Sequence, residues 1–292
     1  MGERITGKFI RKIINLPLTE GYYGNKLGWV DDYSNNSGID LITFIDQKKY
    51  IKNVAKNARI RSIFTTPEIW NKLMKVPLQP IFCDDPRFYF YSLYNYISRA
   101  NYKNEPTIIA DSANVHPRSY VSEHNVVIGK NTIIEPNATI LSDVEIGNNV
   151  IIRAGAVIGS EGFEHKRTTK GVLSVFHNGK VIIHDNVEIG ANTCIDKGFI
   201  KNTIIEAEVK IDNLVHVGHS VTIGKKSFIT AGVIIAGSVG IGDNVWLSPG
   251  VTVLNNVFIG SNSFIGIHSL VIRNVKENAI VFGTPAISLN PE

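Results

Sequence analysis

An aliphatic residue recurs every six positions through the second half of the chain, and this period constrains the fold more than any other feature. From position 205 to position 271, twelve aliphatic residues follow one another at strict six-residue steps: Ile205, Ile211, Val217, Ile223, Ile229, Ile235, Ile241, Leu247, Val253, Ile259, Ile265 and Val271. A period of six is neither the 3.6 of an α-helix nor the period of two of a lone strand. It is typical of a parallel β-helix, in which short strands each place one aliphatic side chain inside and successive coils stack them into a continuous core.

Aliphatic residues with the same period precede this run, with interruptions. They are Ile109, Val115, Val121, Ile128, Ile134, Ile140, Ile146, Ile152, Ile158, Ile183, Ile189 and Ile195. The step from 195 to 205 is ten residues, and an insertion at 160–180 breaks the repeat. Glycine often follows the aliphatic residue, and glycine and asparagine tolerate the positive φ that we expect at the corners. The sequence predicts a β-helix over residues 106–285 and a short tail at 286–292.

Residues 1–105 lack the repeat and predict a small α/β domain. The segments 40–45 and 60–66 are typical of short strands. Thr66 and Pro67 predict the start of a helix over 66–76, and Asp85 and Pro86 predict the start of a second helix over 84–100. The fold class is therefore mainly β, with an α/β domain before the β-helix.

Charge and cysteine content exclude several classes of function. The net charge is +4 and no long run of lysine or arginine concentrates it, which suits anionic small molecules better than nucleic acid. Two cysteines, Cys83 and Cys194, do not support a disulfide framework. No apolar run approaches the ~20 residues of a membrane span. We expect a cytoplasmic protein with no integral membrane segment.

Two histidines three positions apart, His216 and His219, stand out in this scaffold. If three hexads make one coil, Gly237 lies one coil above His219. An imidazole can accept a proton from an attacking amine or hydroxyl near neutral pH, and a glycine N–H can stabilise an oxyanion. We therefore expect His219 and Gly237 to be catalytic in acyl transfer, and His216 to shape the substrate site.

The spacing of the two histidines also raises a zinc hypothesis, since the γ-class carbonic anhydrases bind zinc through histidines on a left-handed β-helix. A catalytic zinc site usually needs three protein ligands. The positions one coil away, 198–201 and 234–237, offer none. We predict no metal site. A zinc-dependent hydratase and a binding or scaffold protein without chemistry stay open as alternatives.

Four segments carry a resemblance to a known family: VIGSEGF at 157–163, NGKVIIHDNVEIGANTCIDKG at 178–198, IDNLVHVGHSVTIG at 211–224 and AGVIIAGSVGIG at 231–242. In this order they resemble the UDP-3-O-acylglucosamine N-acyltransferases of lipid A synthesis, which are hexapeptide-repeat acyltransferases. The resemblance implies a left-handed β-helix with three hexads in a coil and a homotrimer with active sites between subunits. It also implies that His219 is the general base and that Gly237 lies at the oxyanion site.

Further residues take roles from the same resemblance. DLITFIDQKKY at 40–50 and CDDPRFYFYSLYNYI at 83–97 are similar to the uridine-binding domain of that family. The resemblance implies that Phe44 stacks on uracil and that Tyr50 lines the nucleotide pocket. Gln47 replaces the asparagine usual in the family, and its longer amide can still reach the base.

The resemblance and the charge pattern each add residues to the expected site. Asp212 and Asn213 match an Asp-Asn pair that precedes the catalytic histidine, and they are expected to line the site. The insertion at 160–180 carries basic residues that could meet a pyrophosphate: Lys166, Arg167, Lys170 and Lys180.

The chain also departs from that family. Its first block of hexads is shorter, and VLNNV at 253–257 lacks the family's second histidine. We expect no helices that could receive acyl carrier protein after the segment FGTPA. That segment resembles coenzyme-A-dependent sugar acetyltransferases.

These departures favour an N-acyltransferase that transfers an acyl group from acyl-CoA to the amino group of a nucleotide-linked amino sugar, for bacterial surface polysaccharide or glycolipid synthesis. The alternative is lipid A N-acylation itself, with acyl carrier protein as the donor and partner. Neither hypothesis involves a tightly bound cofactor.

Overall fold

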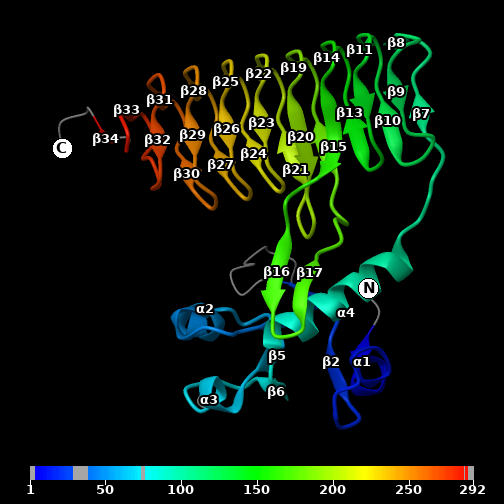
Figure 1. The fold of residues 1–292 in the computed structure, drawn as a ribbon, viewed down its shortest axis with the longest axis vertical. Helices are drawn as coiled ribbons and strands as arrows, with labels where there is room; N and C mark the ends of the chain where they lie inside the picture. Colours follow the sequence, from blue (N-terminus) through cyan, green and yellow to red (C-terminus); the bar gives the residue numbers. More distant parts are fainter. Residues whose placement is uncertain (1–3, 29–38, 74–75, 286, 289–292) are drawn as a thin grey trace. The chain divides into compact units, whose positions relative to one another are not determined.

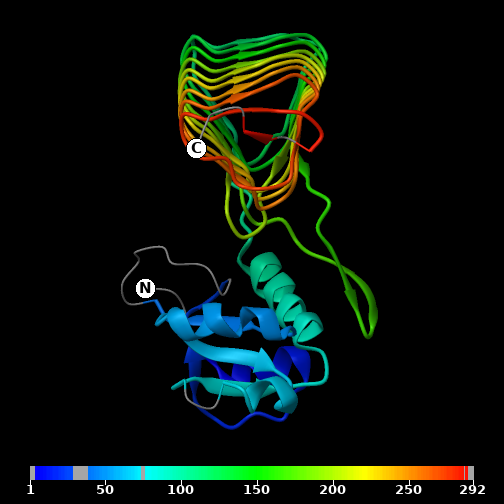
Figure 2. The same ribbon diagram turned by 90° about the vertical axis from the view of Figure 1, so that its left-hand side faces the viewer.

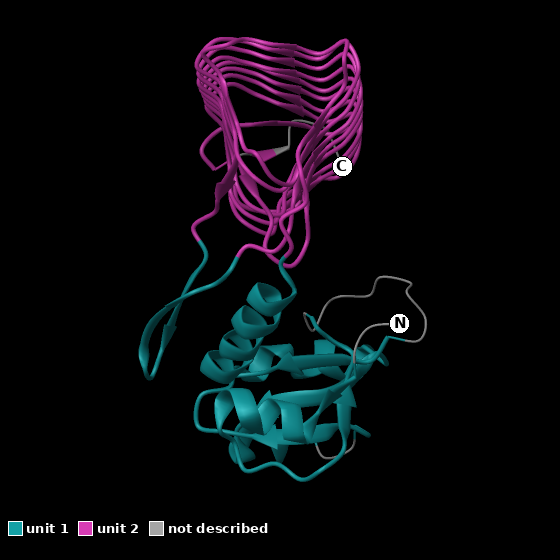
Figure 3. Cartoon of the chain, turned by 90° about the vertical axis from the view of Figure 1, so that its right-hand side faces the viewer, with its two compact units in different colours: residues 1–102, 164–176 teal, residues 103–163, 177–292 magenta. Residues whose placement is uncertain are grey.

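The structure is a computed structural model, and it describes residues 4–28, 39–73, 76–285 and 287–288. The chain divides into two compact units, coloured separately in Figure 3. Unit 1 consists of residues 1–102 and 164–176, and unit 2 consists of residues 103–163 and 177–292. Unit 1 therefore contains a segment that lies far from its other residues in the sequence.

Unit 1 is built around a parallel sheet with the strand order β3–β4–β5–β6, of which Figure 1 labels β5 and β6. These strands are β3 (Lys26–Leu27), β4 (Leu41–Phe44), β5 (Ile60–Thr65) and β6 (Gln79–Phe82). A second small sheet pairs β1 (Ile5–Thr6) with β2 (Tyr22–Gly24). The helices are α1 (Gly7–Ile14), η1 (Lys48–Tyr50), α2 (Ile51–Lys56), α3 (Pro67–Trp70) and α4 (Pro86–Asn101). None of the described helices has both the length and the apolar composition that crossing a bilayer requires.

The two helix starts lie where the capping residues predict them. The Thr66 side chain accepts a hydrogen bond from the Ile69 N–H, and the Asp85 side chain accepts one from the Phe88 N–H at 2.9 Å. The helix predicted over 66–76 is wrong in length, because α3 ends at Trp70 and a tight turn follows, in which the Leu73 N–H donates to the Trp70 carbonyl. Residues 74–75 of that prediction lie outside the described residues.

The insertion at 160–180 contains an antiparallel hairpin of β16 (His165–Thr168) and β17 (Gly171–Ser174). The insertion therefore has regular secondary structure of its own. Residues 164–176, which include both strands, are part of unit 1 rather than of the β-helix that they interrupt.

Unit 2 is a left-handed parallel β-helix with three faces, and Figure 2 shows its stacked coils end-on. One face contains β7 (Ile108–Ile109), β10 (Val126–Ile128), β13 (Val144–Ile146), β18 (Val181–Ile183), β21 (Thr203–Ile205), β24 (Thr222–Ile223), β27 (Gly240–Ile241) and β30 (Phe258–Ile259). The second face contains β8 (Asn114–Val115), β11 (Ile133–Ile134), β14 (Ile151–Ile152), β19 (Glu188–Ile189), β22 (Lys210–Ile211), β25 (Phe228–Ile229), β28 (Trp246–Leu247), β31 (Phe264–Ile265), β33 (Ile280–Phe282) and β34 (Ile287–Ser288).

The third face of the β-helix carries the residues discussed below. It contains β9 (Tyr120–Val121), β12 (Thr139–Ile140), β15 (Val157–Glu161), β20 (Cys194–Lys197), β23 (His216–Val217), β26 (Ile234–Ile235), β29 (Thr252–Val253) and β32 (Leu270–Val271). Strand β34 covers the described part of the tail predicted at 286–292, and residues 286 and 289–292 lie outside the described residues.

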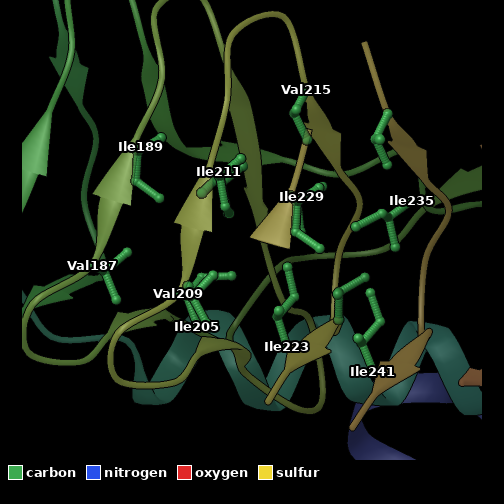
Figure 4. Packing of buried hydrophobic residues seen from close by; sticks show 14 of the residues in the cluster. Val187, Ile189, Ile205, Val209, Ile211, Val215, Ile223, Ile229, Ile235 and Ile241 are labelled. Atoms are coloured by element: carbon green, nitrogen blue, oxygen red, sulfur yellow. The ribbon is translucent and has the colours of Figure 1, made fainter. Parts of the chain in front are cut away.

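Strand register confirms that three hexads make one regular coil. Ile211 pairs with Ile229, and Val217 pairs with Ile235. The inward aliphatic side chains form one buried column along unit 2, part of which Figure 4 shows. Ile109 is an exception, since 41% of it is exposed. Its strand β7 is the end of its sheet, so that only one neighbouring coil covers it.

The positive φ expected at the corners does not fall mainly on the glycines that follow the aliphatic residues. Of the glycines that follow the aliphatic residue, Gly159 has a positive φ of 93°, but Gly129, Gly224 and Gly242 do not have a positive φ. A Cβ at Gly224 would lie 2.4 Å from the backbone of Gly242 in the next coil, so glycine is required there by close packing. The positive φ falls two positions later, for example at Asn131 (φ 57°) and Asn244 (φ 55°).

Candidate functional site

His219 lies at the corner that follows strand β23, directly beneath Gly237 of the next coil. The Ser238 N–H donates to the His219 carbonyl at 2.8 Å, which fixes the two corners against each other. A Cβ at position 237 would lie 2.5 Å from Nε2 and Cε1 of the His219 imidazole. The half-buried imidazole therefore occupies space that only a glycine at 237 leaves free.

A second glycine, Gly162, borders the same imidazole. A Cβ at position 162 would lie 2.8 Å from Cβ and 2.9 Å from Cδ2 of His219. Gly162 follows strand β15, where the chain leaves the β-helix for the hairpin. Its position in the motif at 157–163 pointed to the family, but its contact with His219 was not predicted.

Two more rings surround His219, and sequence reasoning missed both. The ring centroid of Phe199 lies 5.3 Å from that of His219, and the centroid of His177 lies 6.2 Å from it, both in edge-on geometry. Phe199 is 5% exposed and His177 is 2% exposed. The signal for Phe199 was the ten-residue step between 195 and 205, since the extra residues form the corner that carries it.

Buried hydrogen bonds hold this long corner against the His219 corner. The Thr203 hydroxyl donates to the Asp196 carbonyl at 2.7 Å and accepts from the Ser220 N–H at 2.8 Å. Thr203 is completely buried. At the end of β20, just before this corner, Lys197 Nζ donates to Asp143 Oδ2 at 2.9 Å, and both side chains are buried. The backbone N–H of Ser220, the residue after His219, is therefore bonded to the buried side chain of Thr203.

His216 lies on the outer surface of strand β23, beside two polar residues of strand β20. Its Nε2 atom lies 3.7 Å from Asp196 Oδ2, and its register partner is Cys194. Ser160 donates to Asp196 Oδ1 at 2.6 Å. Burial, with a further contribution from Asp196, raises the pKa of the Cys194 thiol. Side chains that can ligate a metal therefore meet on this face, namely Cys194, Asp196 and His216.

Asp212 and Asn213 lie at a different corner, between strands β22 and β23. The Asp212 carboxylate accepts from the Asn213 N–H at 2.7 Å, and the Asn213 side-chain oxygen accepts from the Ala191 N–H at 2.7 Å. Within one chain, the structure therefore does not bring these residues together with His219. The two residues precede His219 by one corner of the same coil, which explains the separation.

In unit 1, Phe44 lies at the carboxyl end of strand β4 and is half-buried. Its ring packs against Phe90 at 4.9 Å and Tyr91 at 5.6 Å between centroids. The carboxyl ends of parallel strands are the usual ligand-binding edge of an open sheet. A partly exposed aromatic ring at that edge can stack on a planar base.

Charged side chains surround this edge. Arg87 forms an ion pair with Asp46 at 2.6 Å. Lys166 of the hairpin lies 5.0 Å from the Tyr91 ring centroid and forms an ion pair with Glu164. Burial, with a further contribution from Glu164, raises the pKa of the Tyr91 hydroxyl well above its ordinary value. Lys166 of the insertion thus lies close to an aromatic residue that contacts Phe44, within unit 1.

Gln47 and Tyr50 are exposed and follow the same strand edge. Gln47 precedes η1, and its carbonyl accepts from the Tyr50 N–H at 3.2 Å. Tyr50 is 36% exposed, and Lys49 Nζ lies 4.9 Å from its ring centroid. Both side chains are open to solvent at this edge, where a ligand could contact them.

The remaining basic residues of the insertion lie apart from one another. Lys170 donates to the Tyr89 hydroxyl at 3.0 Å, and this bond raises the pKa of its ammonium group. Lys180 is in unit 2, where it pairs with Glu145 at 2.6 Å. Arg167 is exposed. The four basic side chains therefore do not form one cluster within either unit.

Comparison with known proteins gives two short family matches. Residues 125–160 match the family described as bacterial transferase hexapeptide (six repeats). Residues 220–255 match the family described as hexapeptide repeat of succinyl-transferase. Both matches lie in unit 2 and agree with the coil length seen in the structure.

Curated relatives carry the name of the family that the sequence resembles. The chain is 57% identical over 145 residues to UDP-3-O-acylglucosamine N-acyltransferase 2 of Legionella pneumophila, a match that covers 50% of this chain and 42% of the relative. It is 30% identical over 219 residues to UDP-3-O-acylglucosamine N-acyltransferase of Helicobacter pylori, covering 67% of this chain and 64% of the relative. The matches thus span less than two thirds of these relatives.

Among solved structures, the chain is similar to a UDP-N-acetylglucosamine acyltransferase from Campylobacter jejuni. The TM-score is 0.54 with 21% sequence identity, and the match covers 62% of this chain and 71% of that one. At this identity the likeness concerns the fold, and it confirms the predicted left-handed β-helix.

Proposed function

We propose that this chain is an acyltransferase that transfers an acyl group from a thioester to the amino group of a nucleotide-linked amino sugar. The juxtaposition of the His219 imidazole and Gly237 carries this proposal. The named relatives favour UDP-3-O-acylglucosamine as the acceptor, which was the alternative in the sequence analysis. They support it better than an unspecified surface-sugar pathway.

His219 is the proposed general base. The sugar amine attacks the thioester carbonyl, a C–N bond forms, and the imidazole takes the proton that the amine loses. When the tetrahedral intermediate collapses, the C–S bond breaks and the thiolate takes the proton from the imidazolium. The packing of Gly162 and Phe199 around the ring supports this role, because a base must be held in one orientation to contribute its full rate effect.

Gly237 is the proposed oxyanion donor. Within the described residues, its N–H makes no hydrogen bond to another group of the chain. An N–H left unbonded at a rigid corner can donate to the oxyanion of the intermediate without reorganisation. Asp212, Asn213 and His216 are proposed to contact the acceptor sugar, with the first two supplied by a second copy in a homotrimer.

Unit 1 is proposed to bind the nucleotide. Phe44 would stack on the base, Gln47 and Tyr50 would complete the pocket, and Lys166 would approach the diphosphate. The nucleotide sugar and the thioester donor are both water-soluble substrates, which suits a reaction in the cytoplasm. No tightly bound cofactor is part of this proposal.

An acylation assay tests the acceptor and the donor together. Purified protein is incubated with UDP-3-O-acylglucosamine, and the donor is either acyl carrier protein or coenzyme A loaded with the same acyl group. Mass spectrometry should detect an N-acylated product with one donor, and UDP-N-acetylglucosamine, whose nitrogen is already blocked, should stay unmodified. If neither donor acylates UDP-3-O-acylglucosamine or another nucleotide-linked amino sugar, the proposed function is wrong.

A further inference from the structure

The outer surface of the β-helix beside His216 brings together a thiol, a carboxylate and an imidazole. Cys194 and Asp196 come from strand β20, and His216 comes from the adjacent strand β23. Cys194 and His216 are direct register partners in the parallel ladder. Because backbone hydrogen bonds fix this register, the three side chains are held together without any contribution from a flexible loop.

The distances between the three side chains suit a tetrahedral metal ion. His216 Nε2 lies 3.7 Å from Asp196 Oδ2, Cys194 Sγ lies 3.9 Å from Asp196 Oδ1, and all three ligand atoms lie within 4.8 Å of one another. Around tetrahedral zinc with bonds of roughly 2.0–2.3 Å, ligand atoms lie roughly 3.4–3.6 Å apart. Small side-chain rotations would therefore close the three groups around one ion.

The surroundings resemble those of metal sites in two further respects. Ser160 donates to Asp196 Oδ1 at 2.6 Å, and an outer hydrogen bond of this kind orients a ligating carboxylate. Asp196 is 7% exposed, whereas 45% of the His216 side chain is exposed. The buried side of the site is therefore ordered, and the exposed side leaves an entry path and an open coordination position.

We propose that Cys194, Asp196 and His216 bind one divalent transition-metal ion, with zinc preferred. A thiolate with an imidazole and a carboxylate is a donor set for zinc and not for magnesium or calcium, which take oxygen ligands. The sequence analysis predicts no metal site because the positions one regular coil away from the histidine pair offer no ligand. It did not include the register partner of His216, which lies further back in the sequence than three hexads because the corner between β20 and β21 is long.

The metal site shares His216 with the proposed contact to the acceptor sugar, but it includes neither His219 nor Gly237, and the proposed acyl transfer uses no metal. Binding can therefore be measured without acyl donor or acceptor, and its outcome does not depend on whether the protein acylates a sugar.

A cobalt titration tests the proposal on the full-length protein. After removal of metal with a chelator, one equivalent of Co²⁺ should produce the visible bands of tetrahedral cobalt and a near-ultraviolet thiolate-to-cobalt band, and one equivalent of Zn²⁺ should remove both. Elemental analysis after dialysis against Zn²⁺ should give one ion per chain. The absence of stoichiometric binding would overturn the proposal.

Matched variants assign the ligands. Cys194→Ser should remove the thiolate band, and His216→Gln should weaken zinc binding by more than the roughly 10–100-fold that loss of an outer-shell partner costs. Ser160→Ala should weaken it within that range. His184→Gln is the control, because His184 also lies near a carboxylate, Glu206 at 4.0 Å, but belongs to no such cluster in the described residues.

The variants also distinguish the loss of a metal ligand from a loss of folded structure. Circular dichroism of each variant checks that the β-helix is intact, and Cys194 and His216 are suitable positions because both are only partly buried. If Cys194→Ser and His216→Gln bind Zn²⁺ as the unchanged protein does, the ion binds elsewhere and the proposal is wrong.

Discussion

At the scale of single residues, the proposed chemistry depends on one imidazole. We expect His219→Asn to lower kcat by at least about 10²-fold, because general-base catalysis is typically worth ~10²–10⁴-fold in rate. KM for the acceptor should change much less. The readout is steady-state kinetics with the donor identified by the acylation assay. His184→Asn, at a half-exposed position on another corner, should retain activity. Near-normal kcat in His219→Asn would remove this residue from the mechanism.

The glycine above the imidazole gives an independent prediction. Gly237→Ala should displace the His219 ring, because the new Cβ would lie 2.5 Å from Nε2. Overpacking of this kind typically costs ~1–3 kcal/mol, so we expect lower thermal stability together with a loss of kcat.

Gly232→Ala is the control for this substitution. Its φ of +69° strains any side chain, but no heavy atom lies within 4 Å of a Cβ there. It should lower stability and leave kcat unchanged. Equal losses of kcat in both variants would contradict the specific contact between Gly237 and His219.

At the scale of elements, one carboxylate links helix α4 to the hairpin of β16 and β17. Asp85 caps α4 through Oδ1, and its Oδ2 accepts from the Thr169 N–H at 2.6 Å and the Thr169 hydroxyl at 2.9 Å. Burial raises the pKa of Asp85, but the hydrogen bonds from Phe88 and Thr169 outweigh it and hold the pKa below the ordinary value of 3.8. The ionised form is therefore the one that stabilises the fold.

The lowered pKa of Asp85 determines how the stability of the fold changes with pH. Because the folded pKa is lowered, the contribution of Asp85 is fully present above pH 3.8 and is lost as pH falls through its folded value. We expect Asp85→Asn to lower the free energy of unfolding by about 1–2 kcal/mol at pH 7 and by less in strong acid, because asparagine can still cap α4 but its NH2 group cannot accept the hydrogen bonds from Thr169. Urea unfolding of the variant and of the unchanged protein, at pH 7 and in strong acid, measures the difference in the free energy of unfolding at each pH.

Asp84→Asn is the matched control for Asp85→Asn. Asp84 is adjacent and exposed, whereas Asp85 is buried and caps the helix. The control should show little change at either pH. A deficit of Asp85→Asn that grows on acidification would contradict the assigned cause.

The regular elements were predictable from the sequence, and the irregular ones were not. The step of six predicts the strands of unit 2, and a count of three hexads onward from His219 reaches Gly237. The same arithmetic could not place Phe199 or His177 beside His219, because both follow breaks in the repeat. It also could not assign Thr169 to Asp85, which lies 84 positions earlier. Contacts made by inserted segments depend on tertiary packing, which a local period does not encode.

At the scale of the whole molecule, an aromatic stack on one face of unit 2 gives a prediction about assembly. Phe228, Trp246 and Phe264 lie on successive coils, with centroid distances of 5.4 Å and 6.4 Å, and each is at least 41% exposed. Exposed apolar patches of this kind mark interaction surfaces. We expect a homotrimer in which this stack contacts a second copy.

Light scattering after size exclusion tests this assembly. Trp246→Glu should shift the mass from trimer toward monomer, whereas Val172→Glu, at a 72% exposed hairpin position, should not. A monomeric unchanged protein would contradict the expected homotrimer, and a trimeric Trp246→Glu variant would place the contact on another face.

The division of unit 1 into residues 1–102 and 164–176 has a consequence for biosynthesis. A ribosome releases helix α4 well before it releases the hairpin that bonds to Asp85 and Tyr89. Unit 1 can reach its final state only after the first coils of the β-helix have emerged from the exit tunnel. Until residues 164–176 have been translated, the surface of unit 1 that the hairpin contacts therefore stays uncovered.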